Sequence, residues 1–101
     1  MGDADALISI ARNEAASRWE IFVDGELAGF AEWADRTDRV IMAHTVIDKA
    51  FGGRGLGSKL VKFALEDLEA RGAQLVPTCS FVASYVAQHP QYGHLIATPA
   101  E

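Results

Sequence analysis

Hydrophobic residues gather in short runs over the first half of the chain, and polar residues separate each run from the next. Runs of this length and composition predict β-strands. The predicted strands cover residues 7–10, 19–23, 26–33 and 40–47. A polar break at 12–14 is expected to end the first strand, and Asp24-Gly25 is a preferred two-residue hairpin turn. The run 40–47 is almost wholly apolar, which predicts a strand buried on both faces.

An amphipathic helix is predicted in the second half of the chain, from about residue 55 to residue 71. Its polar face is marked at three- and four-residue spacing by Lys59, Lys62, Glu66 and Glu69. The other side carries the apolar residues Leu56, Leu60, Val61, Ala64, Leu65 and Leu68. Gly72 follows where a left-handed C-cap residue is expected. We therefore expect this helix to pack its apolar stripe on the sheet.

A short strand, 74–78, and a last helix, 80–88, complete the predicted elements. A helix that joins strand 40–47 to strand 74–78 makes a right-handed crossover, so these strands should pair in parallel. Pro77 has no N–H to donate, so the two strands should separate there. The expected fold class is therefore mixed α+β. We expect one domain, residues 1–101, with a mostly antiparallel sheet, one β-α-β crossover, a splayed parallel strand pair and two helices.

Four of the nine glycines fall between Gly52 and Gly57, directly before the predicted amphipathic helix. Glycine lets main-chain N–H groups approach a ligand closely, and a helix N-terminus adds unpaired N–H donors and the positive end of its dipole. The segment therefore predicts a site for a phosphate-bearing cofactor. Its basic neighbours are Lys49, Arg54, Lys59 and Lys62.

The glycine segment has other interpretations. A phosphate-binding P-loop needs Lys followed by Ser or Thr, whereas Ser58 precedes Lys59 here. A dinucleotide-binding fingerprint needs a third glycine where Leu60 stands, within repeated βαβ units. Both can be set aside. A glycine-rich turn that serves only close packing of helix and sheet remains open.

Composition narrows the classes of partner. A formal net charge of -5 argues against the broad basic surface that nucleic acid requires. No apolar run reaches membrane-spanning length, and the acidic residues 1–5 are unlike a signal peptide. Cys79 is the single cysteine, which excludes an intramolecular disulfide. We therefore expect a cytoplasmic protein that binds one anionic ligand and has no metal site, nucleic acid or membrane partner.

Three blocks of sequence resemble the GCN5-related N-acetyltransferase superfamily when taken in this order and spacing. They are His44–Asp48, Gly53–Gly57, and Val76–Val82 with His89-Pro90-Gln91-Tyr92 behind it. Together they cover nearly the whole chain, which looks most similar to the small single-domain branch of the superfamily, the YidJ type. The resemblance implies an acetyl-CoA-dependent N-acetyltransferase whose acceptor is a primary amine on a small molecule or an exposed protein site.

The resemblance also implies which residues bind acetyl-CoA or free CoA. Its pyrophosphate would lie on the main-chain N–H groups of Gly52, Gly53, Arg54, Gly55, Leu56, Gly57 and Ser58. The main chain of Val46, Ile47 and Asp48 would pair with the pantetheine amides, as though a strand were added at the splayed edge. Main-chain groups near Val46 would polarise the thioester carbonyl.

Cys79 and His44 are the candidate catalytic residues. Cys79 lies just before a helix N-terminus, which would stabilise a thiolate, although its position alone favours a buried structural cysteine. In the small branch the cysteine at this position is the proposed catalytic residue, which would accept acetyl or assist the attack of the amine. His44 lies near the expected thioester and is a candidate base, although a histidine in an apolar strand is more often a packing residue.

The chain departs from the family pattern at two positions. Gly52 stands where the family usually has Gln or Arg, and Ala87 stands where many members have the tyrosine that protonates the leaving thiolate. Tyr85 is nearby but out of register. These departures, and the lack of extra acceptor-binding elements, leave two alternatives open. One is a non-catalytic CoA-binding module, and the other is a protein-interaction domain without a cofactor.

Overall fold

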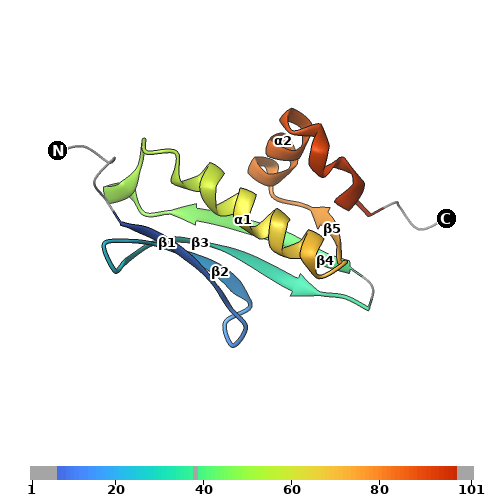
Figure 1. Ribbon diagram of the computed structural model, residues 1–101, viewed down its shortest axis with the longest axis horizontal. Coiled ribbons are helices and arrows are strands. Elements are labelled where there is room, and N and C mark those ends of the chain that lie inside the picture. The colour runs from blue at the N-terminus through green and yellow to red at the C-terminus, as the bar shows by residue number, and fades with distance from the viewer. Residues whose placement is uncertain (1–6, 38, 98–101) are drawn as a thin grey trace.

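The computed structural model describes residues 7–37 and 39–97, so the acidic segment 1–5, where we expect no signal peptide, lies outside the described residues. Five strands form one sheet in the order β1-β2-β3-β4-β5. The elements are β1 (Ile8–Asn13), β2 (Arg18–Val23), β3 (Glu26–Asp35), β4 (Arg39–Ile47), η2 (Lys49–Phe51), α1 (Leu56–Ala70), β5 (Gln74–Pro77), α2 (Ser80–Gln88) and η3 (Pro90–Leu95). Figure 1 shows α1 lying along the sheet, with α2 beside it. The mixed α+β fold class is confirmed.

Strands β1, β2 and β3 each pair antiparallel with the next strand in sequence. The β2–β3 hairpin turns at Asp24 and Gly25, whose φ angles of 51° and 84° are both left-handed. A type I′ turn needs these angles, and Asp and Gly tolerate them, so the predicted turn is confirmed. β1 runs through the polar break at 12–14 as far as Asn13, because Arg12 and Asn13 still pair with residues of β2.

The core lies between α1 and one face of the sheet, which we call the helix face. All six residues of the predicted apolar stripe of α1 are buried there. They share the core with Trp19 and Trp33, whose ring centroids lie 4.5 Å apart. Each fully buried Leu or Val side chain contributes about 1.5–3 kcal/mol, so this contact holds α1 on the sheet. Gly72, with a φ of 68°, is the predicted left-handed residue after α1.

The opposite face of β1 to β4 is covered by no helix in the described part of the chain (Figure 1), and we call it the bare face. β4 shows the consequence. Val40 and Met42 are buried, whereas His44 and Val46 are exposed. The prediction that residues 40–47 are buried on both faces is therefore wrong, because helices cover one face and β5 leaves β4 halfway along.

The parallel pair and the last helix agree with the predictions. β4 and β5 pair in parallel from Arg39 opposite Gln74 to Met42 opposite Pro77, and the pairing ends at the proline. α2 has the predicted bounds, 80–88. Among the described residues, no helix combines the length and apolar character needed to cross a bilayer.

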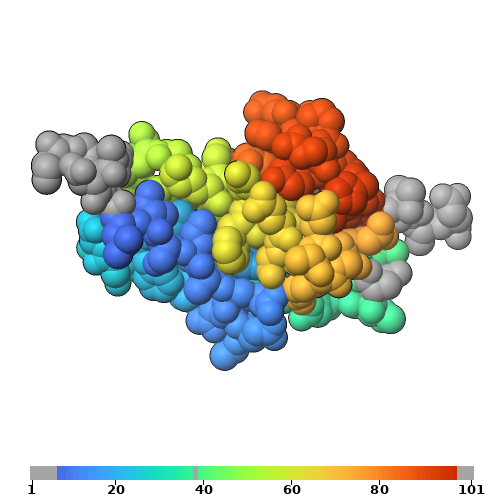
Figure 2. Space-filling view, viewed as in Figure 1, coloured from blue at the N-terminus to red at the C-terminus, as the bar shows by residue number. Residues whose placement is uncertain are grey.

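The hydrophobic pattern gave no prediction for the segment after α2. η3 folds back beside α1, and Figure 2 shows it in red, in one lobe with α2. Buried Tyr92 donates its hydroxyl to Glu66 of α1 at 3.1 Å. Ile96 pairs with Leu75 in a parallel bridge, and the Ala97 N–H donates to the Leu75 carbonyl at 2.8 Å. The segment thus covers part of the otherwise open edge of β5.

One carboxylate ties α1 to the first two strands. Asp67 accepts two bonds from Nη1 of Arg12 on β1, at 2.9 and 2.8 Å, and one from Nε1 of Trp19 on β2, at 3.0 Å. Arg71 Nη1 lies 3.4 Å from the same group. Burial favours the neutral acid, but these donors outweigh it and hold the pKa of Asp67 below its ordinary value.

Asp67→Asn is expected to lower the free energy of unfolding by about 1–3 kcal/mol at pH 7, because it removes the charged acceptor of a partly buried network. The lowered pKa of Asp67 means that wild-type protein keeps this stabilisation above pH about 4 and loses it as the pH falls further. The difference in the free energy of unfolding between wild type and Asp67→Asn should therefore become smaller toward pH 3. Urea unfolding at both pH values measures it, with Glu26→Gln as a surface control. An equal gap at both would contradict this account.

Candidate active site

The carbonyl of Met42 marks the point at which the chain after β5 leaves β4. It accepts the N–H groups of Thr78 and Cys79, each at 3.1 Å, and the Thr78 hydroxyl at 3.2 Å. Three donors on one carbonyl fix the end of β5 at this residue, and the strands do not pair beyond it. Cys79 is therefore placed at the apex of the split between β4 and β5.

β4 bends at the same place. Its register with β3 shifts, because Glu32 lies opposite His44 whereas Trp33 lies opposite Met42. Ala43 is thus the extra residue of a β-bulge, a feature that bends a strand and increases its twist. The bulge in β4 and the proline that ends β5 together open the split.

Beyond the apex, β4 offers main-chain groups on the side that β5 has left. The Asp48 N–H is bonded to a carbonyl of β3 at 2.8 Å, and the Val46 carbonyl lies so close to Gly29 that a Cβ there would overlap it. Both residues therefore direct these groups toward β3. Since main-chain groups of successive residues point to alternate edges of a strand, those of Thr45 and Ile47 face the split.

The structure brings Cys79 and Thr45 together across the split. The Sγ atom of Cys79 lies 3.8 Å from Oγ1 of Thr45. The thiol is half-buried at the N-terminus of α2. Burial raises the pKa of Cys79, but the N–H of Val82, the Thr45 hydroxyl and the N–H of Phe81 outweigh burial and lower it.

The structure does not bring His44 to Cys79. Thr45 lies opposite Ala31, which is buried on the helix face, so its neighbour His44 points to the bare face. There His44 is exposed and lies opposite Glu32 of β3. The two candidate catalytic residues therefore flank the split from opposite faces of the sheet.

The glycine segment forms the turn between η2 and α1. Gly53 and Gly55 have left-handed φ angles of 77° and 72°. Lys59 donates its N–H to the Gly55 carbonyl at 3.3 Å, so the N–H groups of residues 56–58 have no partner within the helix. The positive end of α1 and these donors have the form of the predicted anion site.

Packing explains only part of the glycine segment. A Cβ on Gly57 would lie 3.0 Å from the ring of Phe81, so the first turns of α1 and α2 are in close contact there. Gly53 and Gly55 have no atom within 4 Å of such a Cβ. Close helix packing therefore accounts for Gly57, whereas the other two glycines serve the shape of the turn.

The remaining histidines and Tyr85 have partners of their own. Nδ1 of His89 lies 2.7 Å from the Tyr85 carbonyl, as expected at a helix end, and the two rings stack at 3.9 Å. His94 pairs with Glu69 at 2.9 Å. Ala87 is exposed. No three His, Cys, Asp or Glu side chains within residues 7–37 and 39–97 are placed to hold a metal ion.

Sequence reasoning missed Thr45 as a site residue. Side chains alternate between the two faces of a strand, so the sequence indicates that Thr45 and His44 lie on opposite faces. The bulge at Ala43 shifts this alternation by one residue, so the sequence alone does not say which of the two lies on the helix face. Its contact with a thiol 34 positions away depends on where β5 ends.

Thr45→Val should raise the pKa of Cys79, because it removes a donor from a half-buried thiol. The pH profile of alkylation by iodoacetamide, followed by intact mass, should move to higher pH, and the rate at pH 7 should fall several-fold. The matched control is Thr78→Val, whose lost hydroxyl bonds Met42 rather than the sulfur. A Thr45→Val profile that superimposes on the wild-type profile would show that Thr45 does not act on the thiol.

Several solved structures share this fold. The solution NMR structure of a GCN5-like protein from Staphylococcus aureus has a TM-score of 0.68 and 18% identity, over 92% of this chain and 91% of that one. The ribosomal-protein-S18-alanine N-acetyltransferase of Escherichia coli has a TM-score of 0.60 and 23% identity, over 75% and 50%. A ribosomal-protein-alanine N-acetyltransferase of Brucella melitensis biovar Abortus 2308 has a TM-score of 0.58 and 21% identity, over 89% and 69%.

At these identities the structural matches show a common fold. No curated protein matches the sequence significantly. The family model described as GCN5-related N-acetyl-transferase matches residues 18–95, which is most of the chain. The match confirms the resemblance at the level of the family, while the YidJ-type branch stays a prediction. The chain therefore belongs to the GCN5-related N-acetyltransferase family of acyltransferases.

Proposed function

We propose that this protein uses acetyl-CoA to acetylate a primary amine on a small molecule or an exposed protein site. The observation that carries the proposal is the split between β4 and β5. The open main-chain edge at Thr45 and Ile47 lies along the split, and the thiol of Cys79 lies at its apex. The contact of Gly57 with Phe81 brings the N-terminus of α1 close to the same place. An extended amide chain that ends in a diphosphate fits this arrangement.

Several residues of the chain suit the chemistry of CoA. The N–H groups of residues 56–58 and the left-handed turn at Gly53 and Gly55 suit a pyrophosphate. Gly52 adds no side chain, so the main chain and Arg54 would carry this contact. Ile47 is the residue of the predicted set 46–48 whose main chain suits pantetheine. The neighbouring Asp48 instead caps η2, accepting the Ala50 N–H at 2.9 Å.

Acetyl-CoA would supply an activated thioester carbonyl at the apex of the split. The Thr45 N–H faces this position and would polarise the carbonyl. His44, on the bare face, would take a proton from the amine as its nitrogen bonds to the carbonyl carbon. Cys79, on the helix face, would give its thiol proton to the departing sulfur, or would first accept the acetyl group as a thioester.

The relatives support only the class of acceptor. The E. coli and Brucella proteins are named as N-acetyltransferases of alanine in ribosomal proteins. An α-amino group is a primary amine, which agrees with the proposal. The chain spans half of the E. coli enzyme, however, so the acceptor proposed here is a primary amine and no particular protein.

A CoA-binding module without transfer is the second candidate. Ala87 cannot donate a proton, and Tyr85 is stacked on His89 with a ring centroid 6.3 Å from that of Tyr92. α2 therefore lacks the tyrosine that many family members use at the leaving thiolate. In this candidate Cys79 is a packing residue and the split only binds CoA.

Replacement of Gly55 tests the cofactor site. Gly55 and Gly72 are both left-handed, with φ of 72° and 68°, so alanine at either should cost about 1–2 kcal/mol of stability. Only Gly55 lies at the N-terminus of α1. Excess CoA should raise the Tm of wild type and of Gly72→Ala by several degrees, and that of Gly55→Ala much less. If CoA raised the Tm of both variants equally, the prediction that the N-terminus of α1 binds the phosphates would be wrong.

Cys79→Ala tests the chemistry. Acetyl transfer to an amine panel, measured as release of free CoA thiol, should fall about 100-fold or more, because general-acid or nucleophilic assistance is lost. Intact mass of wild type with acetyl-CoA alone should show an acetyl adduct if Cys79 acts as nucleophile. A wild-type rate in Cys79→Ala would eliminate the thiol from the mechanism. CoA-dependent stabilisation with neither adduct nor turnover would establish the binding module instead.

A further inference from the structure

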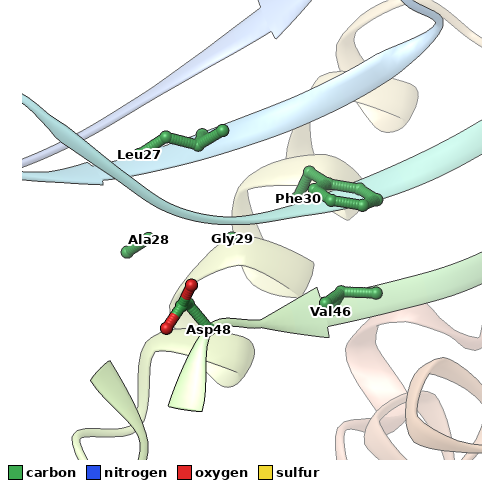
Figure 3. A pocket seen from close by; sticks show the side chains of 6 residues that line it. All are labelled: Leu27, Ala28, Gly29, Phe30, Val46 and Asp48. Carbon is green, nitrogen blue, oxygen red and sulfur yellow. The ribbon is translucent and has the colours of Figure 1, made fainter. Parts of the chain in front are cut away.

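The bare face carries a pocket of about 120 Å³ where β3 begins and β4 ends. It is lined by Leu27, Ala28, Gly29, Phe30, Val46 and Asp48 (Figure 3). Apart from one carboxylate, every lining side chain is apolar. A cavity of about 150 Å³ can hold benzene, so this pocket suits a group between a leucine side chain and a phenyl ring.

Two of the apolar side chains that line the pocket are unusually exposed to solvent. Leu27 is 40% exposed and Val46 is 45% exposed, and both line the pocket. Contiguous exposed apolar surface with a polar border commonly marks a binding site. The border here is acidic, because the carboxylate of Asp48 points into the space between β3 and β4 in Figure 3, held by its bond to the Ala50 N–H.

The pocket lies on the same face of β4 as His44. Val46 and His44 are two residues apart, and beyond the bulge a strand rises about 3.3 Å per residue, so the pocket begins about 7 Å from the candidate base. Glu32 lies directly opposite His44 and makes this end acidic too. Arg18, a cation on this face, is already bound to Glu20 at 2.7 Å.

The end of this surface near His44 and the end at the pocket suit different parts of one molecule. An ammonium group suits Glu32 and His44, and a compact apolar group suits Leu27, Phe30 and Val46. The guanidinium of Arg18 lies over the ring of Phe30, 4.5 Å from its centroid, but Glu20 pairs with it at 2.7 Å and Glu32 lies opposite Arg18 in the sheet. The two carboxylates therefore offset this one positive charge. An anionic ligand would meet carboxylates at both ends.

We propose that this pocket is the specificity site for the acceptor and takes an apolar group about 7 Å from the reacting amine. The proposal rests on the proposed acetyl transfer. The acceptor class is a cationic primary amine with a short linker and a leucine-to-phenyl-sized end. Its nitrogen lies at Glu32 and His44 and reaches the split from the bare face, while CoA occupies the helix-face side.

The test compares 3-phenylpropylamine with propylamine, which lacks the apolar end. The kcat/KM of wild type should favour the phenyl compound about tenfold or more, since a filled apolar pocket discriminates by about 10–200-fold. Leu27→Lys should bring this ratio close to one, because it fills the pocket and repels the cation. Ala70→Lys, at an exposed site on α1, is the matched control and should keep the wild-type ratio.

Binding is measured separately so that failure of the pocket can be told from failure of the transfer reaction. In ¹⁵N-labelled wild type, 3-phenylpropylamine should shift the amide signals of Leu27, Gly29 and Val46, and Leu27→Lys should lose these shifts. CoA should stabilise Leu27→Lys as it does wild type, which shows that the variant is folded. Shifts without turnover would support the pocket and overturn the proposed function. Equal kcat/KM for both amines, or shifts elsewhere, would overturn the pocket.

Discussion

The separation of β4 from β5 at Met42 and Pro77 is the constraint from which the rest of the site follows. Proline ends the ladder because it has no N–H, and the Met42 carbonyl holds the following residues with three donors. The chain after the last strand is thus held at one point while the strands diverge. Cys79 is fixed at the apex, and the main chain of Ile47 has no strand beside it on the edge that β5 has left.

The two faces of the sheet contribute different groups to the candidate site beside the split. The helix face supplies α1, whose N-terminus is ready to hold an anion, and the thiol of Cys79. The bare face supplies His44, Glu32 and the pocket beside Val46. In the proposed reaction, this division would let the acceptor amine approach the acetyl group of bound acetyl-CoA from the opposite face of the sheet, so that both could be bound at once.

α1 must be held firmly for this arrangement to work. Its apolar stripe supplies most of the attachment, and Asp67 adds a directional tie to Arg12 and Trp19. At the other end, the absence of a side chain at Gly57 lets the helix approach Phe81 closely. The N-terminal N–H groups of α1 are therefore positioned by contacts at both ends of the helix, although the turn before them is rich in glycine.

Local sequence determined the elements that depend on neighbouring residues. Asp24-Gly25 specified a left-handed turn, the spacing of leucines specified α1, and the missing N–H of Pro77 specified where the parallel pair ends. These features follow from steric limits and hydrogen-bonding groups within a few residues, so they can be predicted without knowledge of the fold.

Tertiary structure alone decided the rest. Four features depend on segments that are far apart in the chain. They are the exposure of Val46, the bulge at Ala43, the contact of Thr45 with Cys79 and the bond between Arg12 and Asp67. The physical reason is that strand register and the layers that cover a sheet set which face each side chain meets. An apolar run such as 40–47 has the same composition whether or not a second layer packs on it.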